Sequence, residues 1–264
     1  MKSRNVLRAL IGALCIPATA LAQTKVAAGA APTAIRPNEL TDAEREAGWR
    51  LLFDGKSLRG WLLVGTDSIV NWRVEDGAIK RVPIGPGALV PDGHAATRGD
   101  LVSEASFTDF ELSWEWKVVQ GGNSGVKYNV ATDFAGASSA NAAFGFEYQI
   151  LDDSLAEDNA TASHRAGALY DIIAPNELKK LNPAGVWNHS MIVMKGNRGE
   201  HWLNGALIVE FELGTPRVDS LIARSKYALV PDFAKRRAGR IILQDHGGEV
   251  HFRSIKVREI KHEH

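Results

Sequence analysis

The strictest pattern in this sequence is an alternation of apolar and polar side chains from residue 110 to residue 119. The segment reads "FELSWEWKVV", with phenylalanine, leucine, tryptophan and valine at positions of one parity and mostly charged residues at the other. Successive side chains of a β-strand point to opposite faces, so this alternation predicts a strand that buries one face and exposes the other. Half-buried strands of this kind are typical of antiparallel sheets.

Other segments predict further strands joined by tight turns. "MIVMKGNRGEHWLNGALIVEFEL" contains Asn204-Gly205, a pair that favours a two-residue hairpin turn. "RIILQDHGGEVHFRSIKVREI" predicts two strands around Gly247-Gly248. Helical stretches are short, near residues 154–163 and 217–226 and after Thr41, which with Glu44 forms a capping box. The sequence therefore predicts an all-β chain, a β-sandwich or jelly roll with few short helices.

The N-terminal residues have the features of an export signal. A basic start is followed by a short apolar run and by Ala20-Leu21-Ala22, so we expect residues 1–22 to be a signal peptide. Residues 23–40 are rich in alanine and proline and are expected to be a flexible lead-in, followed by a single domain over residues 41–264. These features predict an exported protein, periplasmic or secreted.

Charge and cysteine content exclude several classes of function. The 31 basic and 31 acidic side chains balance, which favours neither nucleic acid nor a membrane surface as a partner. The only cysteine, Cys15, lies in the expected signal peptide. Its removal would exclude disulfides, thiolate metal sites and a cysteine nucleophile.

The segment "AFGFEYQILDD" places polar groups on one face of a predicted strand. Phe144, Phe146 and Tyr148 share one face, whereas Glu147 and Gln149 share the other. In a sandwich, that second face is either an outer face in solvent or the floor of a sugar-binding groove.

The segment "GRIILQDHGGEV" would extend this polar face from a neighbouring strand. Alternation places Gln244 and His246 on one face and Asp245 on the other, where Asp245 would support the turn. Gly247-Gly248 would let the chain reverse beside the groove. Glu147 and His246 together are suited either to binding a divalent cation or to acting as an acid–base pair.

Two irregular segments add further candidates. "NSGVKYN" holds Asn123 and Lys127, and the alternation can bring Lys127 to the same polar face. "SHRAGALYDIIAP" holds His164, Arg165 and Tyr170 around a glycine, and such segments often line sites. Each of these residues is equally compatible with a turn or surface position.

Several segments in a fixed order resemble one known family. They are "AGWRLLFDGKSLRGW", "NSGV", "FEYQILDD", "HRAGALYDIIAP", "GVWNHSMIVMKGNRGEHWLNG" and "GRIILQDHGGEVHFRSIKVREI", spread over about residues 47–260. Together they resemble the 3-keto-disaccharide hydrolase family, also described as 3-keto-glucoside 1,2-lyase/3-keto-2-hydroxyglucal hydratase domains. The resemblance implies a concanavalin A-like β-sandwich, often exported, that acts on oxidised sugars.

The resemblance also implies a mechanism and roles for the candidates. A keto group at carbon 3 acidifies the hydrogen at carbon 2, so a base can remove it, the aglycone leaves by β-elimination, and water adds to the product. His246 would be the base or a metal ligand, and Glu147 a ligand or an acid. The other expected roles are a second base (His164), a donor (Tyr170) and contacts to the sugar (Gln149, Gln244, Asn123, Lys127, Arg165). A divalent metal ion of open identity is compatible with this set.

A non-catalytic, lectin-like carbohydrate-binding module is the alternative. It would present a similar polar face to a small sugar, with exposed aromatic rings for stacking. Here most aromatic residues fall on apolar faces, which argues mildly against that alternative. Either way, the expected partner is a small sugar molecule, and the sequence indicates no particular protein partner.

Overall fold

The computed structural model describes residues 36–64, 71–83, 99–130, 144–230 and 232–261. The expected signal peptide and lead-in up to residue 35 lie outside the described residues, so they stay predictions. Residues 35–264 form one compact unit. Within the described ranges, no helix has the length and hydrophobicity that a bilayer span requires.

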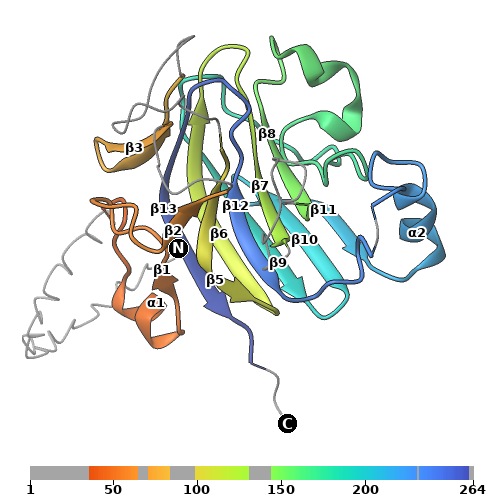
Figure 1. Cartoon of the computed structure of the whole chain (residues 1–264), viewed down its shortest axis with the longest axis horizontal. Helices are drawn as coiled ribbons and strands as arrows, with labels where there is room; N and C mark the ends of the chain where they lie inside the picture. The colour runs from red at the N-terminus through yellow and green to blue at the C-terminus, as the bar shows by residue number, and fades with distance from the viewer. Residues whose placement is uncertain (1–35, 65–70, 84–98, 131–143, 231, 262–264) are drawn as a thin grey trace, which may run out of the picture. The chain divides into compact units, whose positions relative to one another are not determined.

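The described strands form two antiparallel sheets (Figure 1). One sheet has the order β11-β10-β9-β6-β13-β4-β3, with β1 also paired to β13, and the other has the order β2-β5-β12-β7-β8. The strands are β1 (Arg50–Leu51), β2 (Trp61–Leu63), β3 (Trp72–Glu75), β4 (Ala78–Arg81), β5 (Leu101–Phe107), β6 (Phe110–Val118), β7 (Asn123–Val130), β8 (Phe146–Leu151), β9 (Asn188–Lys195), β10 (Arg198–Leu203), β11 (Ala206–Glu212), β12 (Gly239–Leu243) and β13 (Val250–Glu259). The helices are short: α1 (Asp42–Glu46), α2 (Pro216–Ile222) and the 3₁₀ turns η2 (Glu157–Ala160) and η3 (Ala162–His164).

The core lies between the two sheets and is rich in aromatic rings. Trp114 on β6 meets Tyr148 on β8 edge to face, with ring centroids 5.0 Å apart. Phe110 meets Tyr128 on β7 at 6.3 Å in the same geometry. Both β6 residues belong to the apolar parity of the alternating segment, so that parity faces the opposite sheet. The predicted all-β sandwich is confirmed.

Two local predictions are also confirmed. Thr41 and Glu44 form a reciprocal capping box at the start of α1. Asn204 and Gly205 join β10 to β11 with φ angles of 47° and 85°, the left-handed values that this tight turn requires.

Residues 36–40, the end of the expected lead-in, contact the sandwich. The side chain of Asn38 donates to the carbonyl oxygen of Gly77 at 2.8 Å and accepts from the Ser254 amide at 2.8 Å. Leu40 is buried. The packed part of the chain therefore begins before Thr41.

The segment around Gly247-Gly248 connects the two sheets. β12 lies between β5 and β7 in one sheet, whereas β13 lies between β6 and β4 in the other. The chain therefore crosses from one sheet to the other here.

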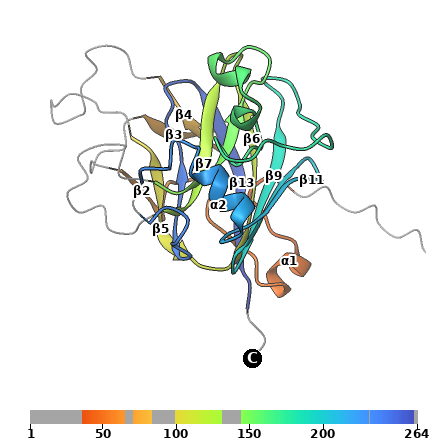
Figure 2. The ribbon, with the colours of Figure 1, turned by 90° about the vertical axis from the view of Figure 1, so that its right-hand side faces the viewer.

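The edge of the five-stranded sheet at β8 is covered by later parts of the chain. Leu169 forms an isolated bridge to Tyr148, and the amide of Tyr170 donates to the carbonyl oxygen of Glu147 at 3.0 Å. Figure 2 looks onto this side of the molecule, with helix α2 in front. This covering turns part of the polar face of β8 into a recess.

Candidate active site

A pocket of about 360 Å³ lies on the outer face of the five-stranded sheet, near the start of β8. Four of its lining residues were predicted from the sequence: Lys127, Glu147, Gln244 and His246. The remaining lining residues include Asp100, Phe144, Lys226 and Tyr227. The face that carries Glu147 is therefore the floor of a recess.

Glu147 is the most unusual group in this pocket. It is 3% exposed and lies directly opposite Lys127 in the β7–β8 register. The ammonium nitrogen of Lys226 lies 3.9 Å from its Oε2 atom. Burial raises the pKa of Glu147, and the charges of Lys127 and Lys226 only partly oppose that shift. A carboxyl group with a raised pKa keeps its proton to higher pH than an ordinary one, which makes Glu147 a candidate for proton transfer.

Gly125 on β7 makes room for this carboxylate. A Cβ atom at residue 125 would lie 2.5 Å from Oε1 of Glu147 and 3.0 Å from its Cγ. These distances are below normal van der Waals contact. A residue with a side chain would therefore displace Glu147 from its position.

Lys127 and Asp100 form an ion pair at the floor of the pocket. Their Nζ and Oδ2 atoms are 2.9 Å apart, and both side chains are largely buried. Although burial opposes it, the charges of Asp100 and Glu147 raise the pKa of Lys127. Oδ1 of Asp100 also accepts from the amide of Asp245 at 2.8 Å. Asp100 is thus fully engaged, and Lys127 supplies a fixed positive charge.

Asp245 supports the turn that carries His246. It was expected on the opposite face from Gln244 and His246, but all three residues line the pocket, because β12 ends at Leu243 and the alternation does not continue beyond it. Its Oδ1 accepts from the Gly247 amide at 3.0 Å and lies 2.7 Å from Nε of the buried Arg81. Its Oδ2 accepts from the side chain of Asn71 at 2.7 Å. His246 itself is exposed at the pocket wall, so its ring is accessible to a bound molecule.

The two glutamines occupy different positions relative to the pocket. Gln149 is 1% exposed; in the orientation that satisfies both ends of its amide, it donates to Oε1 of Glu147 at 3.3 Å and to the Ser124 carbonyl oxygen at 3.0 Å. The Asn123 side chain lies beside it, 3.3 Å away. Gln149 therefore holds Glu147 and contacts Asn123, and neither Gln149 nor Asn123, both expected to contact the sugar, lines the pocket. Gln244 lines the pocket directly.

His164 is held between two carboxylates next to the pocket. Its Nδ1 lies 2.7 Å from Asp158 and its Nε2 lies 2.9 Å from Asp171. Although burial opposes it, the hydrogen bonds to Asp171 and Asp158 raise the pKa of His164. Because both ring nitrogens are engaged, this geometry favours a positioning role over that of a base.

Tyr170 and Lys226 connect this cluster to Glu147. The hydroxyl of Tyr170 donates to Asp158 at 2.8 Å, and Nζ of Lys226 lies 3.9 Å from the centre of the Tyr170 ring. The amide of Lys226 donates to Asp171 at 2.6 Å. Burial lowers the pKa of Lys226, and the charge of Glu147 opposes the shift. The cluster thereby directs an ammonium group at the pocket.

Two candidates differ from expectation. Arg165 is exposed and donates to the carbonyl oxygen of Asn159 within its own loop at 2.9 Å, and it does not line the pocket. Phe144, expected on the apolar face with Phe146, precedes β8 and is 38% exposed at the pocket wall. The alternation does not extend to Phe144 because the strand begins only at Phe146.

Sequence reasoning missed Lys226, Tyr227 and Asp100. Lys226 and Tyr227 follow α2 and reach the pocket only through the fold. No local pattern in the sequence marks either residue.

The donor set does not fit a divalent metal ion. Among the described residues, no three His, Cys, Asp or Glu side chains gather as a metal site. Glu147, the expected ligand, faces the ammonium groups of Lys127 and Lys226, which would repel a cation. We therefore derive no step through a metal.

Comparison with known proteins agrees with this architecture. A 3-keto-disaccharide hydrolase from Bacteroides thetaiotaomicron is 32% identical over 234 residues, which cover 80% of this chain and 78% of that protein. Two crystal structures of candidate glycosyl hydrolases from Parabacteroides distasonis superpose with TM-scores of 0.71 and 0.60, at 29% and 26% identity. They cover 86% and 80% of this chain, and 100% and 99% of their own. The family model described as the 3-keto-alpha-glucoside-1,2-lyase-like domain matches residues 48–258, and the chain belongs to that family.

Proposed function

We propose that this protein cleaves the glycosidic bond of 3-keto-glucosides and 3-keto-disaccharides by elimination followed by hydration. The observation that carries the proposal is the buried carboxyl group of Glu147, with its raised pKa, beside the ammonium groups of Lys127 and Lys226. The similarity to a named 3-keto-disaccharide hydrolase supports the same class of substrate. We further propose, from the N-terminal pattern, that the enzyme acts after export.

In the elimination half, His246 removes the proton at carbon 2. The electron pair of that C–H bond moves into the neighbouring carbonyl group and generates an enolate oxygen at carbon 3. The ammonium group of Lys226 stabilises this negative charge. When the carbonyl re-forms, a double bond forms between carbons 1 and 2, and the bond from carbon 1 to the leaving oxygen breaks. Glu147 donates its proton to that oxygen.

The hydration half uses the same two groups in reverse. Glu147, now a carboxylate, takes a proton from water as the water oxygen bonds to carbon 1. Electrons move through the double bond to the carbonyl oxygen, and protonated His246 returns a proton to carbon 2. Both residues regain their starting states, and one water molecule is consumed for each bond cleaved.

The arrangement of carboxylates is less suited to an ordinary glycosidase. Such an enzyme needs two carboxyl groups on either side of the bond, one as acid and one as base or nucleophile. Here Asp100 is bound to Lys127 at 2.9 Å and Asp245 is bound to Arg81 at 2.7 Å. Glu147 is left as the pocket carboxyl group that can exchange protons.

Deuterium labelling tests this mechanism. Turnover of a 3-keto-glucoside in D₂O should place deuterium at carbon 2 of the released 3-keto-glucose, as read by NMR. The control is 3-keto-glucose kept in the same D₂O buffer without enzyme, which measures spontaneous exchange. Cleavage without deuterium above that control would refute proton abstraction, and cleavage of unoxidised disaccharide at a similar rate would refute the need for the keto group.

A lectin-like binding module is the second candidate, and the exposed ring of Phe144 is the observation that favours it. A module of this kind would bind the 3-keto-glucoside and release no product in the same assay. The raised pKa of buried Glu147 has no use in simple binding, so the enzyme is the better supported function.

A further inference from the structure

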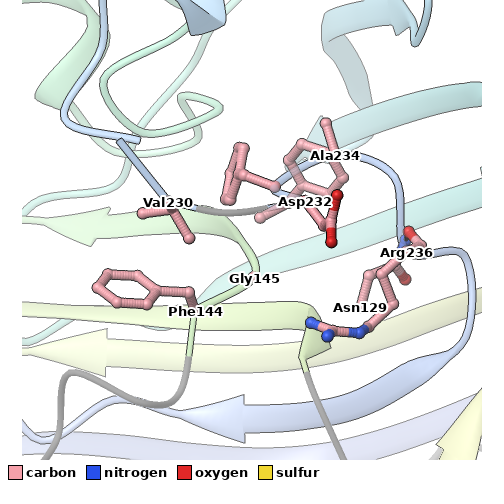
Figure 3. A pocket seen from close by; sticks show the side chains of 9 residues that line it. Asn129, Phe144, Gly145, Val230, Asp232, Ala234 and Arg236 are labelled. Atoms are coloured by element: carbon pink, nitrogen blue, oxygen red, sulfur yellow. Dashed lines mark hydrogen bonds between the residues drawn. The ribbon is translucent and has the colours of Figure 1, made fainter. Parts of the chain in front are cut away.

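A second, smaller cavity adjoins the pocket. Its apolar side includes Phe144, Val230 and Phe233, and its polar side Asn129, Asp232 and Arg236. Figure 3 shows Phe144 and Val230 at one end and Asp232 and Arg236 at the other. Phe144 and Gly145 line both cavities, so the two cavities share a wall. A molecule in the first pocket that extended past Phe144 would reach the second cavity.

The ring of Phe144 is available as a platform. With 38% of its surface exposed, it is the one aromatic residue among the strongly exposed large apolar side chains of the described ranges. An exposed ring at the edge of a polar pocket is suited to contact with the apolar C–H face of a sugar.

Asn129 supplies an unused hydrogen-bond acceptor at the same place. It is 3% exposed, and its amide nitrogen donates to the Arg236 carbonyl oxygen at 3.4 Å. Its Oδ1 atom is buried and has no partner among the described residues. A buried acceptor without a donor is unfavourable, so a ligand that donates to it would be favoured.

The backbone around this cavity is strained in a way that suits a binding site. Asn129, Asp232 and Ala234 all have left-handed φ angles, of 54°, 56° and 67°. Residues other than glycine adopt this conformation at a cost, and such residues cluster at functional sites.

The size of the cavity selects among possible leaving groups. Its volume of about 20 Å³ holds about one water molecule, which is room for a hydroxyl group and too little for an aromatic ring. An apolar platform beside a small polar cavity thus matches a ring that has an apolar face and projecting hydroxyl groups.

We propose that this cavity and Phe144 form a leaving-group subsite that recognises a second sugar ring. The sugar lies on Phe144 and one of its hydroxyl groups donates to Oδ1 of Asn129. The inference rests on the proposed function, because it takes the first pocket as the site of cleavage. In this proposal, Phe144 and Asn129, which take no part in the chemical steps, produce the preference for a disaccharide.

The test compares two substrates in each variant: a 3-keto-disaccharide and a methyl 3-keto-glucoside, whose leaving group is methanol. The readout is the ratio of kcat/KM for the first to kcat/KM for the second. Asn129→Gly, which tolerates the left-handed backbone, and Phe144→Ala should each lower this ratio about tenfold, about 1.4 kcal/mol. Leu229→Ala is the matched control and should keep the wild-type ratio. Leu229 precedes Val230 of the smaller cavity, but it is 93% exposed and lines neither cavity.

A wild-type ratio in both Asn129→Gly and Phe144→Ala would overturn the subsite, provided that thermal melting shows folded proteins. A separate measurement distinguishes failure of the proposed function. If wild-type protein cleaves neither substrate, the function fails, and calorimetric binding of the unoxidised disaccharide then tests the subsite alone. Equal affinity of wild-type and Asn129→Gly proteins in that titration would overturn it as well.

Discussion

Two polar regions of this sandwich contain similar residues in different surroundings. One is the pocket around Glu147. The other is a depression on the outer face of the eight-stranded sheet, lined by Ser113, Glu115, His189 and Arg253 among others. Both combine a glutamate, a histidine and basic side chains. From residue types alone, either region would qualify as a site.

The hydrogen-bond partners separate the two regions. Glu115 accepts from Nε of Arg253 at 2.9 Å and from the Ser254 hydroxyl at 3.0 Å, and its side chain is 28% exposed. Glu147 is buried, its nearest ammonium group is 3.9 Å away, and its pKa is raised. The outer glutamate is thus held in a surface ion pair, whereas burial raises the pKa of the inner one. Burial therefore distinguishes Glu147 from Glu115.

The largest expected effect is on turnover when the inner carboxyl group is removed. Glu147→Gln should lower kcat for a 3-keto-glucoside by about 10²–10⁴-fold, because general acid–base groups contribute that much. Glu115→Gln is the matched control on the outer face and should keep kcat within about twofold. Steady-state kinetics on both variants measures the difference, with circular dichroism as the check on folding. Equal losses in the two variants would contradict the assignment of Glu147.

A smaller effect is expected from the ammonium group beside Glu147. Lys226→Met keeps the length of the side chain and removes its charge, so kcat should fall by about 10²–10³-fold as stabilisation of the enolate is lost. Lys256→Met is the matched control, because Lys256 lines the outer depression and pairs with Glu44, and it should keep kcat close to wild type. A variant at Lys226 with wild-type kcat would show that another group stabilises the enolate.

The smallest effect is a shift in the pH profile. Activity needs Glu147 protonated and Lys226 charged, so it should fall as the pH rises through their pKa values. Burial lowers the pKa of Lys226, and the charge of Lys226 lowers that of Glu147. Without that charge the pKa of Glu147 rises further, so the alkaline limb of residual activity in Lys226→Met should move to higher pH. A profile of kcat against pH for wild type, Lys226→Met and Lys256→Met checks this prediction. A shift of the alkaline limb of Lys226→Met to lower pH would contradict it.

Much of the framework could be predicted from local pattern. The alternation of β6, the Asn204-Gly205 turn and the capping box at Thr41 depend on neighbouring residues only. The same reasoning brought Glu147 and His246 to one pocket, although β7 lies between β8, which carries Glu147, and β12, which ends before His246.

The rest depends on contacts between distant parts of the chain. Lys226 follows a helix and reaches Glu147 from outside the sheet, so no periodicity indicates its role. The hydrogen bonds of His164 to Asp158 and Asp171 depend on the path of an irregular loop, which the alternation of side chains cannot predict. The crossing after β12 is likewise decided by which sheet each strand joins.

The glycine at position 125 makes the site sensitive to a substitution outside its charged residues. A single added methyl group, in Gly125→Ala, would occupy the space that Oε1 of Glu147 fills, at 2.5 Å. A relative with this substitution would keep every charged residue of the pocket, but the carboxyl group of its Glu147 would be displaced. A search of relatives for intact catalytic residues would count such a protein as active. A sequence comparison should therefore require both Gly125 and Glu147 before it assigns the activity to a relative.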